Sequence, residues 1–260
     1  ENDGNKIIKQ QFSRELKEKN NNILEIAEHK KIKTSNNQNL DVYELKGQPF
    51  TMLVHAIVDN KLSINNKYVE QIVNNPEMWN KLEEGNKHIS TSLISNEFIK
   101  VYGIPNNNET IMFGFSNIPS TSIKYTSVRD AGINRNADIN TNYNMRNRLF
   151  IANINTVVSV NDLMQKTIET NLNIPINTRE WNEIGLTRIN EETNEKIKPN
   201  YIVCMDYISE NSKRAAEYYQ IPIYLIHREY YKELPYINEI DNNLTDNKNT
   251  EEKEEIRKSR

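Results

Sequence analysis

The chain is poor in glycine and cysteine and has no long apolar run. Its 260 residues include only 7 glycines and a single cysteine. So few glycines exclude a glycine-rich nucleotide-binding fingerprint, and no G-x-x-x-x-G-K-[ST] phosphate loop is present. A lone cysteine excludes a disulfide framework, and Cys204, inside an apolar run, is expected to be a core residue. No Cys/His cluster has the spacing of zinc ligands, so we expect no metal.

Neither sign of charge prevails, because 33 Lys and Arg face 36 Asp and Glu. Without a basic surplus, we expect no nucleic-acid partner. No segment approaches the roughly 20 apolar residues of a membrane span, and no secretory signal is recognised. A chain that opens on Glu1 can be a piece of a longer protein, so this missing signal does not fix its compartment. We expect a cytosol-type folded domain.

Hydrophobic residues make up 36% of the chain, below the usual globular share, and they gather in short segments. Segments of this length and composition are typical of strands alternating with amphipathic helices. Together they predict an α+β fold with split mixed β-sheets. The expected strands cover residues 50–58, 88–94, 111–115, 149–158 and 183–188, and the expected helices cover residues 67–73, 77–84 and 161–170.

Three regions are expected along the chain. Residues 1–39 form a helical N-terminal segment, with the asparagines at 20–22 dividing residues 5–31 into two helices. Residues 40–240 form the α+β domain, and residues 241–260, almost wholly charged or polar, form a flexible tail. Within the domain, residues 117–147 read as one long polar loop, a length that favours a functional role.

The last part of the domain gives the clearest local pattern. A strand at 201–205, a helix at 209–219 and a strand at 221–226 follow one another, and Ser209 is a good N-cap. A strand, a ten-residue helix and a second strand predict a right-handed parallel crossover.

Polar side chains interrupt three of the expected strands. His55 lies in the middle of an apolar strand, where a buried imidazole needs hydrogen-bond partners. Ser90 and Ser92 share one face of the next strand, and serine is a poor strand former. Glu183 opens a later strand in which Gly185 shares its face and leaves room beside the carboxylate. Each feature alone is also compatible with a structural role. His29 and His88 look incidental, and His227, at the end of the strand at 221–226, is expected to belong to a surface pair.

Taken in chain order, His55, Ser90-Thr91-Ser92 and Glu183 resemble the pattern of the ADP-ribosyltransferase superfamily. That family places Arg or His on its first core strand, a Ser-Thr-Ser or Tyr element on the next strand and Glu on a later one. The resemblance covers about a dozen residues between positions 50 and 190. It implies an NAD cleft between the split sheets and a mono-ADP-ribosyltransferase that modifies a protein acceptor. It also implies a bacterial toxin or effector, secreted or translocated into a host cytosol.

The resemblance implies a role for each residue. Glu183, with Ser90 and Ser92 orienting it, would be catalytic: it would stabilise the oxocarbenium-like transition state of nicotinamide–ribose cleavage. His55 and Thr91 would contact NAD, which acts as the substrate, without a metal.

Further contacts follow from the same resemblance. Phe113 or Phe115 would stack on the nicotinamide, with Phe98 and Tyr102 as other candidates. Arg129, in an arginine-rich stretch, would hold the pyrophosphate. Trp181 would contact the acceptor. Trp181 stands two residues before Glu183, where arginine-specific members carry Glu, and this argues against arginine specificity.

Two other readings stay open. The domain could be a non-catalytic binding or scaffold module, a degenerate relative of the fold, in which replacing Glu183 changes nothing. It could also be a hydrolase of another kind that uses Glu183 and His55 as acid and base.

Overall fold

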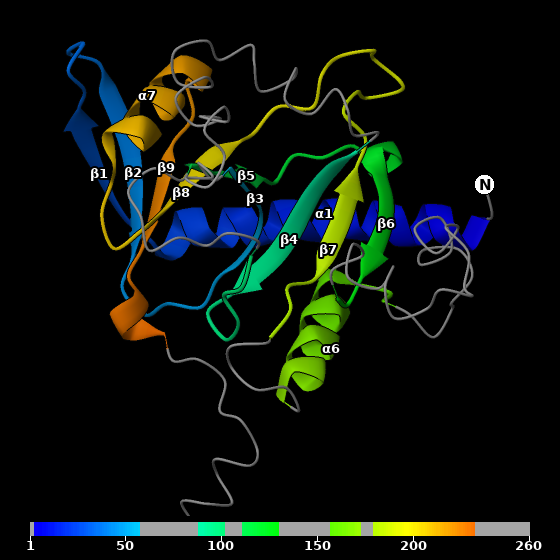
Figure 1. Cartoon of the computed structure of the whole chain (residues 1–260). Helices are drawn as coiled ribbons and strands as arrows, with labels where there is room; N and C mark the ends of the chain where they lie inside the picture. Colours follow the sequence, from blue (N-terminus) through cyan, green and yellow to red (C-terminus); the bar gives the residue numbers. More distant parts are fainter. Residues whose placement is uncertain (1–2, 58–87, 102–110, 130–156, 173–178, 232–260) are drawn as a thin grey trace, which may run out of the picture.

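The computed structural model describes residues 3–57, 88–101, 111–129, 157–172 and 179–231, and it shows a mixed α+β fold (Figure 1). One nine-stranded sheet runs through the molecule in the order β1-β2-β9-β8-β5-β3-β4-β7-β6. The pairs β2–β9 and β8–β9 are parallel and the other neighbours are antiparallel. The α+β class expected from the sequence is therefore confirmed. The strands are β1 (Glu28–Lys33), β2 (Asn39–Leu45), β3 (Thr51–Ile57), β4 (Ile89–Ser95), β5 (Ile111–Phe115), β6 (Ile123–Ser127), β7 (Glu183–Leu186), β8 (Tyr201–Met205) and β9 (Ile223–Ile226).

The N-terminal segment contains one helix, and the expected division into two is wrong. Helix α1 (Asp3–Ile26) continues through the asparagines at 20–22 and crosses the sheet (Figure 1). Phe12, Leu16 and Ile23 are buried on its inner side. Asn20 accepts a hydrogen bond from the Tyr224 hydroxyl, at 2.5 Å, so tertiary contacts offset its weak helix propensity.

Two strands at the start of the sheet differ from the sequence-based expectation. Residues 28–31, expected to be helical, belong to β1, which pairs with β2 in register from Glu28↔Glu44 to Lys33↔Asn39. The expected boundary at residue 39 falls on the first residue of β2. Strand β1 is almost entirely exposed, so its sequence carries no alternation of polar and apolar residues that would indicate a strand.

The terminal strand-helix-strand unit is confirmed. Strands β8 and β9 lie side by side in parallel, and helix α7 (Glu210–Tyr219) joins them. The Ser209 side chain accepts a hydrogen bond from the Ser212 backbone N–H at 3.1 Å, as an N-cap should. Gln220 ends the helix in the left-handed conformation. Helix α7 packs against β8, β5, β2 and β9.

Helix α6 (Val160–Leu172) confirms the helix expected at 161–170. The expected loop at 117–147 is wrong in part, because it contains the 3-10 turn Ser120–Ser122 and strand β6. The helices expected at 67–73 and 77–84, most of the strand expected at 149–158 and the tail at 241–260 lie outside the described residues.

Both faces of the central strands are buried, as the apolar sequence of residues 50–58 predicts. Leu53 belongs to one core cluster, whereas Met52 and Val54 belong to another. Within the described residues, no helix is long and apolar enough to cross a membrane.

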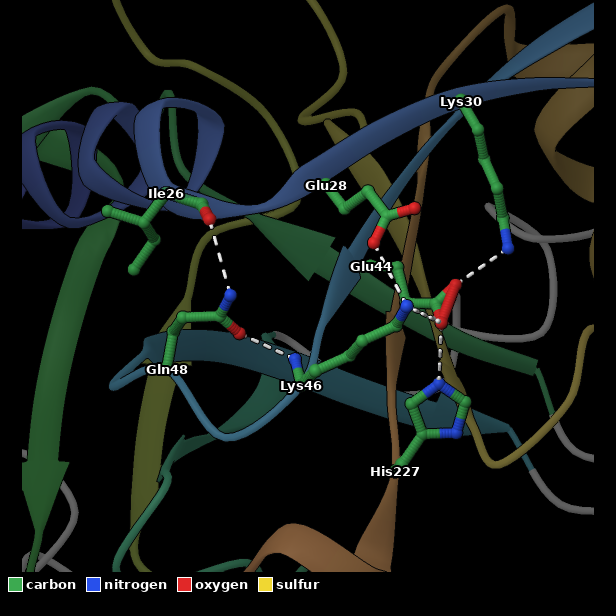
Figure 2. A network of polar contacts seen from close by, with 7 residues as sticks. All are labelled: Ile26, Glu28, Lys30, Glu44, Lys46, Gln48 and His227. Atoms are coloured by element: carbon green, nitrogen blue, oxygen red, sulfur yellow. Dashed lines mark hydrogen bonds and ion pairs between the residues drawn. The ribbon is translucent and has the colours of Figure 1, made fainter.

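A buried carboxylate joins the N-terminal hairpin to the last strand. Glu44 of β2 is 7% exposed and lies opposite Leu225 of β9. Figure 2 shows its contacts: Lys30 at 2.6 Å, His227 Nε2 at 3.1 Å and Lys46 at 3.7 Å. These partners, the Lys30 hydrogen bond first, lower the pKa of Glu44 although burial opposes them. His227, expected in a surface pair, is one of the groups that hold β2 against β9 through Glu44.

Replacing Glu44 by Gln should change how the stability depends on pH. Because the pKa of Glu44 is lowered in the folded protein, its contribution is present above its ordinary value of 4.5 and is lost as the pH falls below that value. We expect Glu44→Gln to lower the free energy of unfolding at pH 7 by about 1–2 kcal/mol and to flatten the loss below pH 4.5. Urea unfolding from pH 3 to 8 measures this, with the exposed Glu25→Gln as the control. An unchanged pH slope would contradict it.

Candidate functional site

Strand β4 lies between β3 and β7, and it pairs with each of them along a different half of its length. Its second half pairs with β3, and that ladder ends at Val54↔Ser92. Its first half pairs with β7, where Ser90 lies opposite Gly185 and Thr91 opposite Ile184. The sheet therefore splits at Thr91 and Ser92, and the three candidate segments lie on the neighbouring strands β3, β4 and β7.

Side-chain hydrogen bonds fix the start of β7 against β4 on both sides of Glu183. The Asn182 amide accepts from the Leu93 N–H at 2.7 Å and donates to the Leu93 carbonyl at 2.9 Å. The Asn182 side chain thus makes the two hydrogen bonds to Leu93 that a backbone residue of β7 would make in a regular ladder. On the other side, the Thr91 hydroxyl donates to the Ile184 carbonyl at 2.7 Å. The backbone of Glu183 is held between these two contacts.

The Glu183 carboxylate is buried and receives two hydroxyl groups on one oxygen. The residue is 3% exposed. Ser90 Oγ and Tyr125 Oη each donate to Glu183 Oε1 at 2.5 Å. The expected contact of Ser90 with Glu183 is therefore present, whereas the sequence analysis missed Tyr125.

The position of Tyr125 depends on a bulge and on a glycine. The β6–β7 register runs from Ile123↔Leu186 to Tyr125↔Gly185, so Lys124 is the extra residue. This bulge puts Tyr125 on the face of β7 that carries Glu183. A Cβ atom at Gly185 would lie 2.2 Å from Tyr125 Cε1. The room expected beside the carboxylate is thus filled by the tyrosine ring.

His88, which looked incidental in the sequence, also lies close to this carboxylate. Its Nε2 lies 2.9 Å from Tyr125 Oη and 3.7 Å from Glu183 Oε1. The His88 and Tyr125 rings meet edge-on with centroids 5.3 Å apart. Because His88 immediately precedes β4, two residues before Ser90, the alternation of a strand was the one signal that could have placed it on the Ser90 face.

His55 contacts β4 across the gap where the sheet splits. It is the first residue of β3 beyond the β3–β4 ladder, and its Nδ1 is hydrogen-bonded to the Ser90 carbonyl. A carbonyl only accepts, so Nδ1 carries the hydrogen and, in the neutral ring, Nε2 is an acceptor. The half-buried imidazole thus meets the same residue whose hydroxyl contacts Glu183.

Three residues predicted to contact NAD, Phe113, Phe115 and Thr91, are buried in the structure. Phe113 and Phe115 are each 0% exposed and belong to the core, where Phe113 packs edge-on against Tyr219. Neither ring has a face open to a nicotinamide, because sheet packing covers both. Thr91 is 1% exposed, and its hydroxyl donates to the Ile184 carbonyl and so holds β4 against β7.

The other predicted residues lie near Glu183 and keep their roles as predictions. Ser92 is buried, and extending the β4–β7 register by one residue puts it opposite Glu183. Trp181 is half-buried, two residues before Glu183. Arg129 is exposed and follows β6, whose last residue, Ser127, lies opposite Glu183. Tyr102 and the other arginines of the expected loop lie outside the described residues.

Cys204 is a core residue, as its apolar surroundings predict. It is 5% exposed, and burial raises the pKa of its thiol to about 11. A thiol of this kind is protonated at neutral pH and is not a nucleophile.

Comparisons with protein-family models, with curated proteins and with solved structures find no match for this chain. The functional argument therefore depends on the geometry around Glu183.

Replacing Asn182 by Ala should destabilise the split between β4 and β7. The substitution leaves the buried N–H and C=O of Leu93 without their partner, which costs about 2–4 kcal/mol in the free energy of unfolding. Chemical denaturation measures the loss, with the exposed Asn117→Ala as the control, for which a change within about 0.5 kcal/mol is expected. Equal stability of the two variants would show that the Asn182 contacts do not hold the strands.

Replacing Gly185 by Ala should displace the Tyr125 ring. We expect a loss of stability of about 1–3 kcal/mol from overpacking. Combining Gly185→Ala with Tyr125→Ala should cost less than the sum of the two single changes, since the shortened side chain leaves room for the new methyl group. Strict additivity in urea unfolding would contradict the close packing.

Proposed function

We propose that the protein transfers ADP-ribose from NAD to a protein acceptor. The observation that carries the proposal is the contact between Ser90 and Glu183, with His55 bonded to the same serine. These residues come from β3, β4 and β7, which are neighbours in the sheet. The resemblance to ADP-ribosyltransferases calls for this order of strands, with histidine, Ser-Thr-Ser and glutamate in turn.

The reaction places a demand on the carboxylate. As the bond between the nicotinamide nitrogen and ribose C1 breaks, nicotinamide takes the electron pair and leaves as a neutral molecule. Positive charge then develops on the ribose ring. A nucleophile of the acceptor forms the new bond to C1 and releases its proton. An anion held close to the ring lowers the energy of this transition state more than that of bound NAD, which is the condition for catalysis.

Glu183 has the surroundings for this task. It is buried, where charges interact more strongly than in water. The hydroxyls of Ser90 and Tyr125 fix its position before the substrate arrives, so that little reorganisation is needed during the reaction.

His55 is proposed to contact NAD. Its imidazole is hydrogen-bonded to the Ser90 carbonyl, beside the Ser90–Glu183 contact, and is proposed to hydrogen-bond a ribose hydroxyl. Arg129 is proposed to contact the pyrophosphate, and Trp181 the acceptor. A protein with this activity is proposed to act as a bacterial toxin or effector.

The proposal is tested with NAD that carries a label in its adenylate part and with a cell lysate as the source of acceptors. We expect the label to appear on protein and nicotinamide to be released. Glu183→Gln should slow both by about 100- to 1000-fold, since it removes the charge aimed at the transition state. The exposed Glu191→Gln serves as the matched control and should behave as wild type.

Two results would overturn the proposal. One is the absence of both label transfer and nicotinamide release with folded wild-type protein. The other is equal activity of wild type and Glu183→Gln. Capture of a protein partner without NAD binding, unchanged in Glu183→Gln, would favour a non-catalytic scaffold instead.

A further inference from the structure

A chain of polar contacts leads from His88 through Tyr125 to Glu183. His88 Nε2 lies 2.9 Å from Tyr125 Oη, which lies 2.5 Å from Glu183 Oε1. The three residues come from different segments: one immediately precedes β4, one lies on β6 and one opens β7. Tyr125 and Glu183 are 2% and 3% exposed, so bulk water does not compete freely for these atoms.

Counting hydrogens leaves two arrangements. A tyrosine hydroxyl has one hydrogen, so of His88 Nε2 and Glu183 Oε1 it can donate to only one. In the first arrangement it donates to Glu183 and accepts from a hydrogen on His88 Nε2. In the second it donates to His88 Nε2, and a protonated Glu183 donates to Tyr125.

The surroundings favour the first arrangement. Ser90 also donates to Glu183 Oε1, at 2.5 Å, and two donors on one oxygen stabilise the ionised carboxylate. His88 Nε2 itself lies only 3.7 Å from that oxygen, where a hydrogen on the nitrogen is favourable next to negative charge. Both contacts therefore disfavour the second arrangement, in which Glu183 is protonated and His88 Nε2 carries no hydrogen.

We propose that His88 is a positioning residue: by donating from Nε2 to the Tyr125 hydroxyl, it directs the single hydrogen of Tyr125 toward Glu183. Nε2 carries this hydrogen in the cationic ring and in one neutral tautomer. His88 thus acts on the carboxylate through another side chain and need not touch the substrate. The catalytic part of this inference rests on the proposed transfer of ADP-ribose.

The first test is a double-mutant cycle on nicotinamide release. We expect His88→Phe, which keeps a flat ring without a donor, to lower kcat about tenfold with little change in KM for NAD, the size typical of a group that orients another. In a Tyr125→Phe background the same substitution should change kcat less than about twofold, because the hydroxyl it acts on is gone. His88→Gln, which can donate again, should restore part of the activity.

Additive losses in the cycle would overturn the inference, as would a kcat for His88→Gln no higher than that of His88→Phe. His29→Gln is the control, since His29 lies on the exposed edge strand β1, bonded to Asp41. Denaturation curves of every variant separate a loss of kcat from a loss of folded protein.

The second test does not need activity. A long-range ¹H–¹⁵N spectrum of the histidine rings reports which nitrogen of His88 carries hydrogen. We expect a protonated Nε2 at pH 7, and an unprotonated Nε2 would overturn the inference. If wild type releases no nicotinamide, the transfer proposal fails, and this spectrum still decides the direction of the hydrogen bond.

Discussion

Burying a carboxylate is costly unless hydrogen-bond donors surround it, and this constraint organises the part of the sheet formed by β4, β7 and β6. Glu183 is 3% exposed, and an ionised group at such a depth needs compensating contacts. The donors are the hydroxyls of Ser90 and Tyr125, one from the strand on each side of β7. Displacing either strand would remove one of these donors from the buried carboxylate, so the sheet and the site stabilise each other.

The same constraint explains the irregular features around the site. A regular β6–β7 ladder would turn Lys124 toward Gly185 and send Tyr125 to the other face, so the bulge at this position is required for the second donor. The split of the sheet has a corresponding cost, because backbone groups at Leu93 lose a strand neighbour. The Asn182 amide supplies both missing hydrogen bonds. A side chain thus supplies the hydrogen bonds that the backbone loses where the sheet splits.

The sequence predicted the parts that depend on local composition. The buried strand β3, the Ser-Thr-Ser strand β4 and the β8–α7–β9 unit each carry an apolar pattern or a cap that can be read without neighbours. The prediction of strands from the sequence missed β1, whose exposed residues show no alternation of polar and apolar residues. It also missed β6, whose polar sequence looks like a loop. Of the candidate site, Glu183, Ser90 and His55 were recognisable as polar residues on apolar strands. Tyr125 was not, because a bulge in a strand that the sequence did not reveal brings it to the carboxylate. His88 was missed for a different reason: it opens the strand expected at residues 88–94, but nothing local showed that its ring would meet Tyr125.

The order of strands also limits when the sheet can be completed during synthesis on the ribosome. Strands β8 and β9 lie between β2 and β5, although they come more than eighty residues after β5 in the chain. The hairpin of β1 and β2 therefore cannot join the rest of the sheet until residue 226 has emerged. Strands β3 to β7, which carry the site, pair among themselves and do not have to wait for β8 and β9. Pairings between such distant segments form slowly, so the nascent chain keeps the β2 edge open until its last strand arrives.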